Sequence, residues 1–426
     1  MRAHLERPET GREKTREGIG TTDMCLQHSR KRSARSRSAW VAAAVSLVCS
    51  VLVARPGPAI AFQWPWDRDG PWPSSSNEPV RELDHALLLP GEAEGRDVRF
   101  VVFGDQRALA DREWPELIAR IADLHAGSAV DFILDTGDIV YDGRDSDQFH
   151  FLRNLLRPVR DIPYLVAVGN HEVHNNDSPE ARANTAAFLG YVDAQFDAER
   201  MYYRKDIGPA TFLLLDSNDL VYGPHGERGA CPDTIAPNTP EGRQMVWLSE
   251  QLALTPTERL VIVVVHHPFV QASDKHLSQA RSLWNTRFGG RSILDMLADA
   301  GVDLVLTGHT HTYERYRLER SDGRTVSLVN ISGRPRDAFL WYGASSRRPE
   351  DIRGEELEWF EEEGFDPLDG WSISQEEVML SEDEANQFAL FMLGPDGRLT
   401  MEVRFLDEDA PDGVRAAPVV ELHSGL

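Results

Sequence analysis

The sequence has very little cysteine. Only three of the 426 residues are cysteine, and two of them, Cys25 and Cys49, lie near the N-terminus. Cys231 is therefore the single thiol beyond the first 61 residues. If the first 61 residues are removed as a signal peptide, the remaining thiol cannot form a disulfide within its own chain, and it cannot provide a thiolate cluster for a metal. We interpret Cys231 as a structural residue rather than a nucleophile.

Positive charge is scarce outside the N-terminal segment. The formal net charge is -24, although residues 1–61 carry about 11 Lys and Arg against 5 Asp and Glu. The rest of the chain therefore has a charge close to -30. Such a surface repels nucleic acid and anionic membranes. We expect neither of them to be a stable partner of this part of the chain.

Long apolar runs are also rare. Residues 40–54 form one run of about 15 residues, which is short for a membrane span. Basic residues precede it, and Ala59-Ile60-Ala61 follows. A basic region, an apolar run and an Ala-x-Ala site, in that order, predict that residues 1–61 are a signal peptide and that the chain is exported to the periplasm or secreted. An uncleaved N-terminal membrane anchor is the alternative.

The remaining chain has the composition of a globular protein, with 41% hydrophobic and 27% charged residues overall. Residues 62–97 are rich in proline, serine and tryptophan, and we interpret them as a linker or N-terminal arm. Residues 98–426 are expected to form one domain. It carries an acidic insertion near residues 350–385, which we interpret as a solvated helical segment. The alternative is that its acidic face binds metal ions.

Apolar runs of strand length alternate with helical patterns from residue 98 onward. Residues 98–103, 132–134 and 164–168 are predicted strands, and apolar residues recur at helical spacing between them. This alternation predicts an α/β fold with a largely parallel sheet. The closely spaced strands predicted at residues 201–205 and 211–215 indicate a second, mixed sheet.

Further strands are predicted at residues 260–265 and 302–306. Side chains that can bind metals follow these two and the strands at residues 98–103, 132–134 and 164–168. Singly, each could be a turn residue, a helix cap or a core histidine. Together, they follow strands whose carboxyl ends meet at one edge of a sheet. Carboxylate, amide and imidazole groups suit iron, zinc or manganese. The ordered set predicts a two-metal site in which one aspartate serves both ions; its members are Asp105, Asp138, Asn170, His266, and His309 with His311.

The motifs GDQR, GDIVY, GNHE, VVVHHP and GHTHTYER occur in this order across roughly residues 98–320. They resemble the calcineurin-like metallophosphoesterase superfamily and are most similar to the purple acid phosphatases. The resemblance implies a four-layer αββα sandwich of two mixed sheets, with a dinuclear centre at their carboxyl edges. It implies a first ion held by Asp105, Asp138, Tyr141 and His311, and a second held by Asp138, Asn170, His266 and His309.

Tyr141 bears on the identity of the two ions. As a tyrosinate ligand it favours Fe(III), paired with divalent iron, zinc or manganese. If Tyr141 only packs beside the site, both ions are divalent.

Arg107 departs from the family pattern, which has histidine or glycine two residues after the first aspartate. A guanidinium group cannot bind a metal ion. We interpret Arg107 as a bidentate clamp on a substrate phosphate. A surface salt bridge with Asp111 or Glu113 is the alternative.

The resemblance implies that the chain hydrolyses phosphate monoesters with metal-activated water and no covalent intermediate. The expected partner is a small phosphorylated substrate, and the oligomeric state is left open. The position of His171 in the motif implies that it supplies or orients the proton for the leaving group. His276 is a second candidate for this role. His267 is expected to lie behind the metal ligands without binding an ion. A phosphodiesterase or nucleotidase is one alternative. A non-catalytic, metal-binding exported protein, with its site blocked by Arg107, is another.

Overall fold

The fold is described from a computed structural model. The described residues are 78–87, 93–107, 114–128, 130–222, 235–271, 277–333, 370–379, 387–407, 410 and 414–425. The chain divides into two units, Met1–Gln63 and Trp64–Leu426, and every described residue belongs to the second. The predicted signal peptide, Cys231 and His276 lie outside the described residues. Within the described ranges, no helix is both long and apolar enough to cross a membrane.

The first sheet is mixed and has the strand order β15-β14-β13-β1-β2-β3, with β16 also pairing with β14. Its parallel part consists of β1, β2 and β3. The strands are β1 (Val98–Phe103), β2 (Phe132–Asp135), β3 (Tyr164–Val166), β13 (Gln387–Leu393), β14 (Arg398–Leu406), β15 (Val414–Ala416) and β16 (Val420–Ser424).

The second sheet is also mixed, with the order β12-β10-β11-β9-β6-β5-β4. Its central strands β5, β6, β9 and β11 are parallel, and the outer strands pair antiparallel. The strands are β4 (Tyr203–Ile207), β5 (Ala210–Leu214), β6 (Leu260–Val264), β9 (Leu304–Thr307), β10 (Tyr313–Arg320), β11 (Thr325–Ile331) and β12 (Trp371–Met379). A separate two-stranded ribbon joins β7 (Arg287–Phe288) to β8 (Arg291–Ser292).

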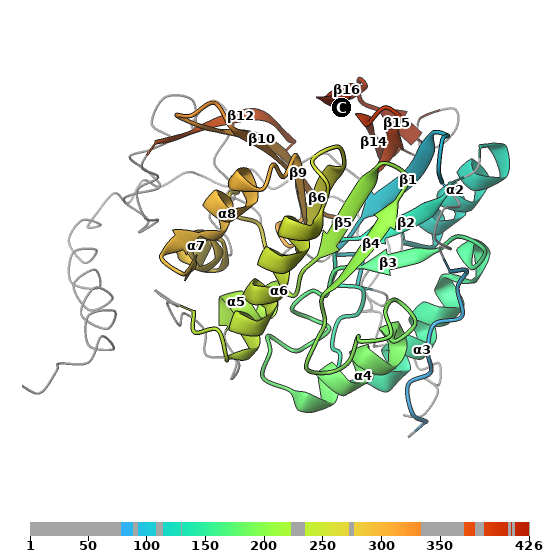
Figure 1. The fold of residues 1–426 in the computed structure, drawn as a ribbon. Coiled ribbons are helices and arrows are strands. Elements are labelled where there is room, and N and C mark those ends of the chain that lie inside the picture. Colours follow the sequence, from blue (N-terminus) through green and yellow to red (C-terminus); the bar gives the residue numbers. More distant parts are fainter. Residues whose placement is uncertain are drawn as a thin grey trace, which may run out of the picture. The chain divides into compact units, whose positions relative to one another are not determined.

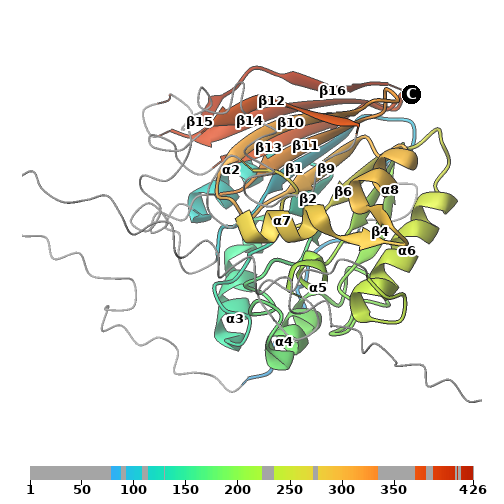
Figure 2. The ribbon, with the colours of Figure 1, turned by 90° about the vertical axis from the view of Figure 1, so that its left-hand side faces the viewer.

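The helices flank the strands on two sides, with α6, α7 and α8 on one side and α2 and α3 on the other (Figure 1). In Figure 2, α3 and α4 lie at the opposite end of the strand layers from β16 and the C-terminus. The helices are α2 (Trp114–Gly127), α3 (Ser146–Leu155), the 3₁₀ turn η2 (Arg157–Val159), α4 (Pro179–Leu189), α5 (Ser217–Tyr222), α6 (Pro240–Leu254), α7 (Leu277–Asn285) and α8 (Ile293–Asp299).

Alternate residues of the second sheet pack into two different apolar cores. Phe212 and Leu214 of β5 face the first sheet, whereas Leu213 faces the core that contains residues of α6, α7 and α8. This follows from the period of two in a strand. On the first sheet's outer side, α2 contributes Leu117 and Ile118. The predicted four-layer αββα arrangement is thus confirmed.

Part of the acidic stretch near residues 350–385 forms a strand. Residues 371–379 form β12, which pairs antiparallel with β10, so the prediction of a helical segment is wrong for them. Trp371 is buried, and Glu376 pairs with Arg315 of β10 at 2.8 Å. Pairing with a distant strand outweighs the local acidic composition. Residues 350–369 lie outside the described ranges.

Phe100 lies at the centre of the core between the two sheets. Its ring stacks on Phe132 at 4.7 Å and on Phe391 at 4.8 Å, and meets Phe212 edge-on at 5.5 Å. Replacing Phe100 by alanine is expected to lower the free energy of unfolding by about 3–5 kcal/mol, because it leaves a cavity among these rings. Urea denaturation measures the loss. Phe151→Ala on the exposed face of α3 is the control; equal losses in both variants would contradict the prediction.

Candidate metal centre

The loops that follow strands of both sheets bring the predicted ligands together. Asp105, Asp138 and Asn170 follow the adjacent parallel strands β1, β2 and β3. His266 follows β6, and His309 follows its neighbour β9. All five side chains are buried, with at most 7% of Asn170 exposed. The centre therefore lies where the carboxyl ends of the two sheets meet.

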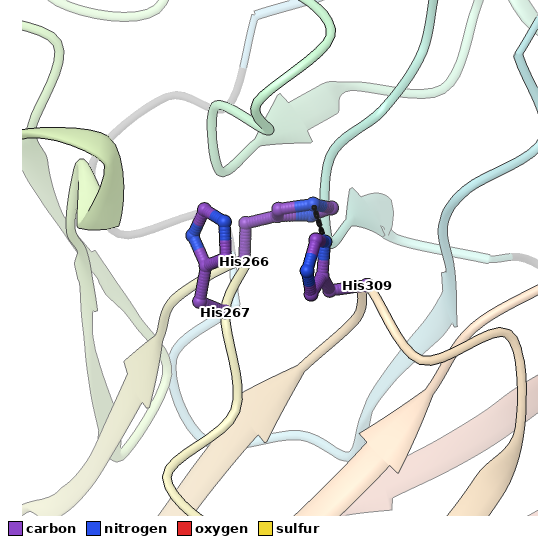
Figure 3. Close-up of side chains that lie close together, drawn as sticks. All are labelled: His266, His267 and His309. Atoms are coloured by element: carbon purple, nitrogen blue, oxygen red, sulfur yellow. Dashed lines mark hydrogen bonds between the residues drawn. The ribbon is translucent and has the colours of Figure 1, made fainter. Parts of the chain in front are cut away.

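Four of these side chains converge on one point. His266 Nε2 lies 3.1 Å from Asn170 Oδ1, 3.3 Å from Asp138 Oδ1 and 3.2 Å from His309 Nδ1. Donor atoms that share one ion at 2.0–2.2 Å are roughly 3.0–3.5 Å apart. Figure 3 shows the contact between the rings of His266 and His309, with His267 beside them. The expected ligands of the second ion thus have the spacing of a coordination shell.

Hydrogen bonds orient two of these donors. His266 Nδ1 lies 2.8 Å from the carbonyl oxygen of Thr136, which can only accept, so Nδ1 holds the proton and Nε2 presents its lone pair. The amide nitrogen of Asn170 donates to Asn175 Oδ1 at 3.1 Å, which turns Asn170 Oδ1 toward the cluster. An imidazole lone pair and an amide oxygen pointing at one place fit a metal ion.

The expected donors of the first ion are also buried together. His311 Nε2 lies 3.6 Å from Asp105 Oδ1, an atom that accepts no hydrogen bond from any described residue. Arg107, however, extends its guanidinium into this group. Its Nη2 lies 3.2 Å from Asp138 Oδ2 and 3.1 Å from His311 Nε2. Asp111 and Glu113, the alternative partners predicted for Arg107, lie outside the described residues.

Tyr141 lies at the edge of this group. Its side chain is 47% exposed, and its ring packs against that of His171 at 5.4 Å. No hydrogen bond among the described residues joins its hydroxyl to Asp105, Asp138 or His311. The carbonyl oxygen of Tyr141 accepts from Nδ1 of His171 at 2.5 Å, which leaves His171 Nε2 facing Asp138 Oδ2 at 3.7 Å. Tyr141 thus orients His171 through its backbone.

The ligand loops use an unusual backbone conformation. Asp105, Asp138, His309 and His311 have φ angles between 59° and 74°, a region that non-glycine residues seldom occupy. Each such residue costs of order 1–3 kcal/mol unless its surroundings hold it in place. Here, the amide of Asp105 donates to the Gly137 carbonyl, and that of His309 to Asp105 Oδ2, both at 2.8 Å. The loops of the two sheets therefore hold one another in the ligand-presenting conformation.

Glu172 is a positioning residue that sequence reasoning missed, although its letter stands in the GNHE motif. Its Oε2 accepts from the amides of Asp138 and Gly169, and its Oε1 from that of Val140. A Cβ at Gly169 would lie 2.3 Å from Asp138 Oδ1, so only glycine permits this approach. Nothing in the local sequence indicates that this glutamate joins two loops.

His267, which was predicted to lie outside the ligand set, lies beside two of the ligands. Ring nitrogens of His266, His267 and His309 lie within 4.8 Å of one another. Its Nδ1 is 2.7 Å from Ser217 Oγ, and its ring contacts that of Tyr222 edge-on. His276, the second candidate proton donor, lies outside the described residues.

Burial and neighbouring charges shift the pKa values in the centre. Burial raises the pKa of Asp105 to about 6. Burial also acts to raise the pKa of Asp138, but His266, His171 and Arg107 together hold that pKa well below its usual range. Burial and the charge of Arg107 lower the pKa of His171 to about 4. Asp138 is therefore the most strongly ionised carboxylate in the centre.

Asp219 lies in a second buried network, outside the ligand loops. It accepts from Asn176 at 3.1 Å and lies 3.5 Å from Arg182. Burial and the charge of Asp216 raise its pKa to about 7, against the pull of Arg182. The folded state therefore keeps a proton that the unfolded state releases between about pH 4 and pH 7. Stability from this group is fully present below pH 4 and is lost as the pH rises toward 7.

Replacing Asp219 by asparagine is expected to reduce this loss, because the amide cannot ionise. The part of the free energy of unfolding that depends on pH through Asp219 is at most about 4 kcal/mol. Thermal unfolding at pH 5 and pH 8 measures it as a smaller change in Tm for the variant than for the native chain. Asp123→Asn on the exposed face of α2 is the control. The prediction fails if all three proteins change by the same amount.

The motif-based resemblance is matched by comparison with known proteins. The family model for calcineurin-like phosphoesterases matches residues 98–313, about half of the chain. The chain belongs to the calcineurin-like phosphoesterase family. All the expected ligands that converge on His266 lie within the matched range. Buried clusters of histidine and aspartate, such as Asp105, Asp138 and His266, fit the metal dependence of this family.

Relatives within the family include purple acid phosphatase 21 of Arabidopsis thaliana, 26% identical over 52% of this chain and 45% of its own length. The acid phosphatase type 7 of Homo sapiens is 26% identical over 51% of this chain and 47% of its own length. The chain thus spans about half the length of these relatives. Among solved structures, a dimetal phosphatase from Danio rerio is similar over 76% of this chain and 99% of its own, with 16% identity and a TM-score of 0.47.

Proposed function

We propose that the chain is an exported metal-dependent hydrolase of phosphate monoesters. The observation that carries the proposal is the convergence of Asp138 Oδ1, Asn170 Oδ1 and His309 Nδ1 on His266 Nε2 in a member of this family. These four residues would hold a divalent ion. When bound there, the ion supplies positive charge to the phosphoryl oxygens and makes water more acidic.

Side chains around this position would handle the substrate and its protons. His171 holds a proton at Nδ1 against the Tyr141 carbonyl and presents Nε2 to the site, where it can exchange a proton with the leaving oxygen. Arg107 adds a positive charge beside Asp138. This local charge favours a phosphate dianion despite the acidic surface. The relatives named acid phosphatases support a monoester substrate.

Activity assays on the whole chain test the proposal. We expect p-nitrophenyl phosphate to be hydrolysed faster than bis-p-nitrophenyl phosphate, with activity lost to a chelator and restored by Zn²⁺, Mn²⁺ or Fe²⁺. Asn170→Ala should abolish turnover, whereas Asn154→Ala, on the exposed side of α3, should keep it. Faster diester hydrolysis would indicate a phosphodiesterase or nucleotidase. Metal binding without hydrolysis of either probe would indicate a non-catalytic protein.

Export is proposed from the sequence of residues 1–61 alone. Expression of the full chain in a bacterium, followed by fractionation, should place it outside the cytoplasm with an N-terminus near Phe62. A full-length chain in the membrane fraction would indicate an uncleaved anchor.

A further inference from the structure

Arg107 contacts two donors that the first ion needs. Its Nη2 lies 3.2 Å from Asp138 Oδ2 and 3.1 Å from His311 Nε2, and only 12% of its side chain is exposed. The guanidinium is always a donor, so His311 Nε2 must accept. An imidazole nitrogen has one lone pair, which can bind either an N–H group or a metal ion. Arg107 and a first ion therefore compete for the same atom.

The backbone holds Arg107 in this position. Its amide donates to the carbonyl oxygen of Asp138 at 3.0 Å, and its φ angle is 45°. The loop after β1 is thus tied to the loop after β2 at the residue whose guanidinium meets Asp138. The main chain and the side chain of Arg107 both bind the same aspartate, so the conformation of the loop fixes the position of the guanidinium.

Electrostatics opposes an ion beside this guanidinium. Asp105 and Asp138 are two buried carboxylates, and Arg107 already supplies one positive charge to them. A further cation bound by Asp138 Oδ2 and His311 would lie next to the guanidinium in a water-poor site, where like charges repel strongly. The set around His266 differs, because Asn170 and His266 make their side-chain contacts with Asn175, with the Thr136 carbonyl and with other members of the set.

We propose that Arg107 replaces the first metal ion, so that the centre binds a single divalent ion on Asp138, Asn170, His266 and His309. Arg107 would neutralise Asp138 Oδ2 and keep Oδ1 directed at the one ion. This inference rests on the proposed function for the location of the metal, and it departs from the dinuclear centre and the phosphate clamp expected from the motifs. Tyr141 then has no ion to bind, in agreement with its half-exposed ring.

Metal stoichiometry tests the proposal without an activity readout. The purified full chain is stripped with a chelator, loaded with excess Mn²⁺ or Zn²⁺, desalted and analysed by plasma mass spectrometry. We expect one equivalent for the native chain, one for the control Arg96→Gly, which removes an exposed arginine that pairs with Asp131, and two for Arg107→Gly. His311→Ala should still bind one, and His266→Ala should bind none. In the Mn²⁺ form, only Arg107→Gly should show the electron paramagnetic resonance signal of a coupled manganese pair.

Two equivalents in the native chain would overturn the proposal and return Arg107 to a role on the substrate phosphate. The native chain alone decides this, so the test survives a failure of Arg107→Gly to fold. One equivalent without phosphatase activity would leave this inference standing while the proposed function fails. No metal bound by any variant would overturn both.

Discussion

Replacing Asp138 by asparagine is expected to lower kcat/KM on p-nitrophenyl phosphate by at least about 10³-fold, a loss of roughly 4 kcal/mol in transition-state stabilisation. Asp138 Oδ1 belongs to the group around His266 Nε2, and it also accepts from the amide of His171. Oδ2 pairs with Arg107. The substitution removes the anionic ligand and leaves the guanidinium buried without its partner.

Metal content and steady-state kinetics measure this effect together. The variant should lose bound metal and activity in parallel, and excess Zn²⁺ or Mn²⁺ should restore little of either. Asp123→Asn on α2 is the matched control and should retain both. An Asp138→Asn variant that keeps its metal and more than a tenth of its activity would show that another group holds the centre together.

Replacing His171 by alanine is expected to lower kcat by about 10²–10⁴-fold while the metal content stays unchanged. His171 Nδ1 donates its proton to the Tyr141 carbonyl oxygen, so Nε2 is the ring nitrogen that can gain or lose a proton on the side of the site. If Nε2 takes up a proton from solvent and delivers it to the leaving oxygen, the loss should be larger for an alkyl phosphate, whose leaving group needs the proton, than for p-nitrophenyl phosphate.

The comparison of the two substrates separates catalysis from folding. A purely structural role for His171 would reduce both activities by the same factor and would alter the thermal stability. His150→Ala on α3 provides the control for loss of a histidine. Equal losses on both substrates with unchanged thermal stability would remove His171 from the proton-transfer step and leave it a role in orienting the substrate.

The strands that carry the centre could be predicted because their apolar runs are continuous and are followed directly by ligand-type residues. Residues 98–103 coincide with β1, and the ends of β2, β6 and β9 fall within a residue of the predicted ends. Local patterns of this kind depend only on neighbouring residues. β12 could not be predicted, because its partners in β10 lie about 50 to 65 residues earlier in the sequence and an acidic run precedes it.

The sequence by itself determined the family, the two-sheet architecture and the set of residues that can bind a metal, because ordered motifs and apolar periodicity are written along the chain. The tertiary structure alone decided how those residues meet. It showed that Glu172 bridges two loops, that His267 adjoins His309, and that Arg107 lies between Asp138 and His311. These relations depend on the direction of side chains from loops of different strands, which no spacing in one dimension records.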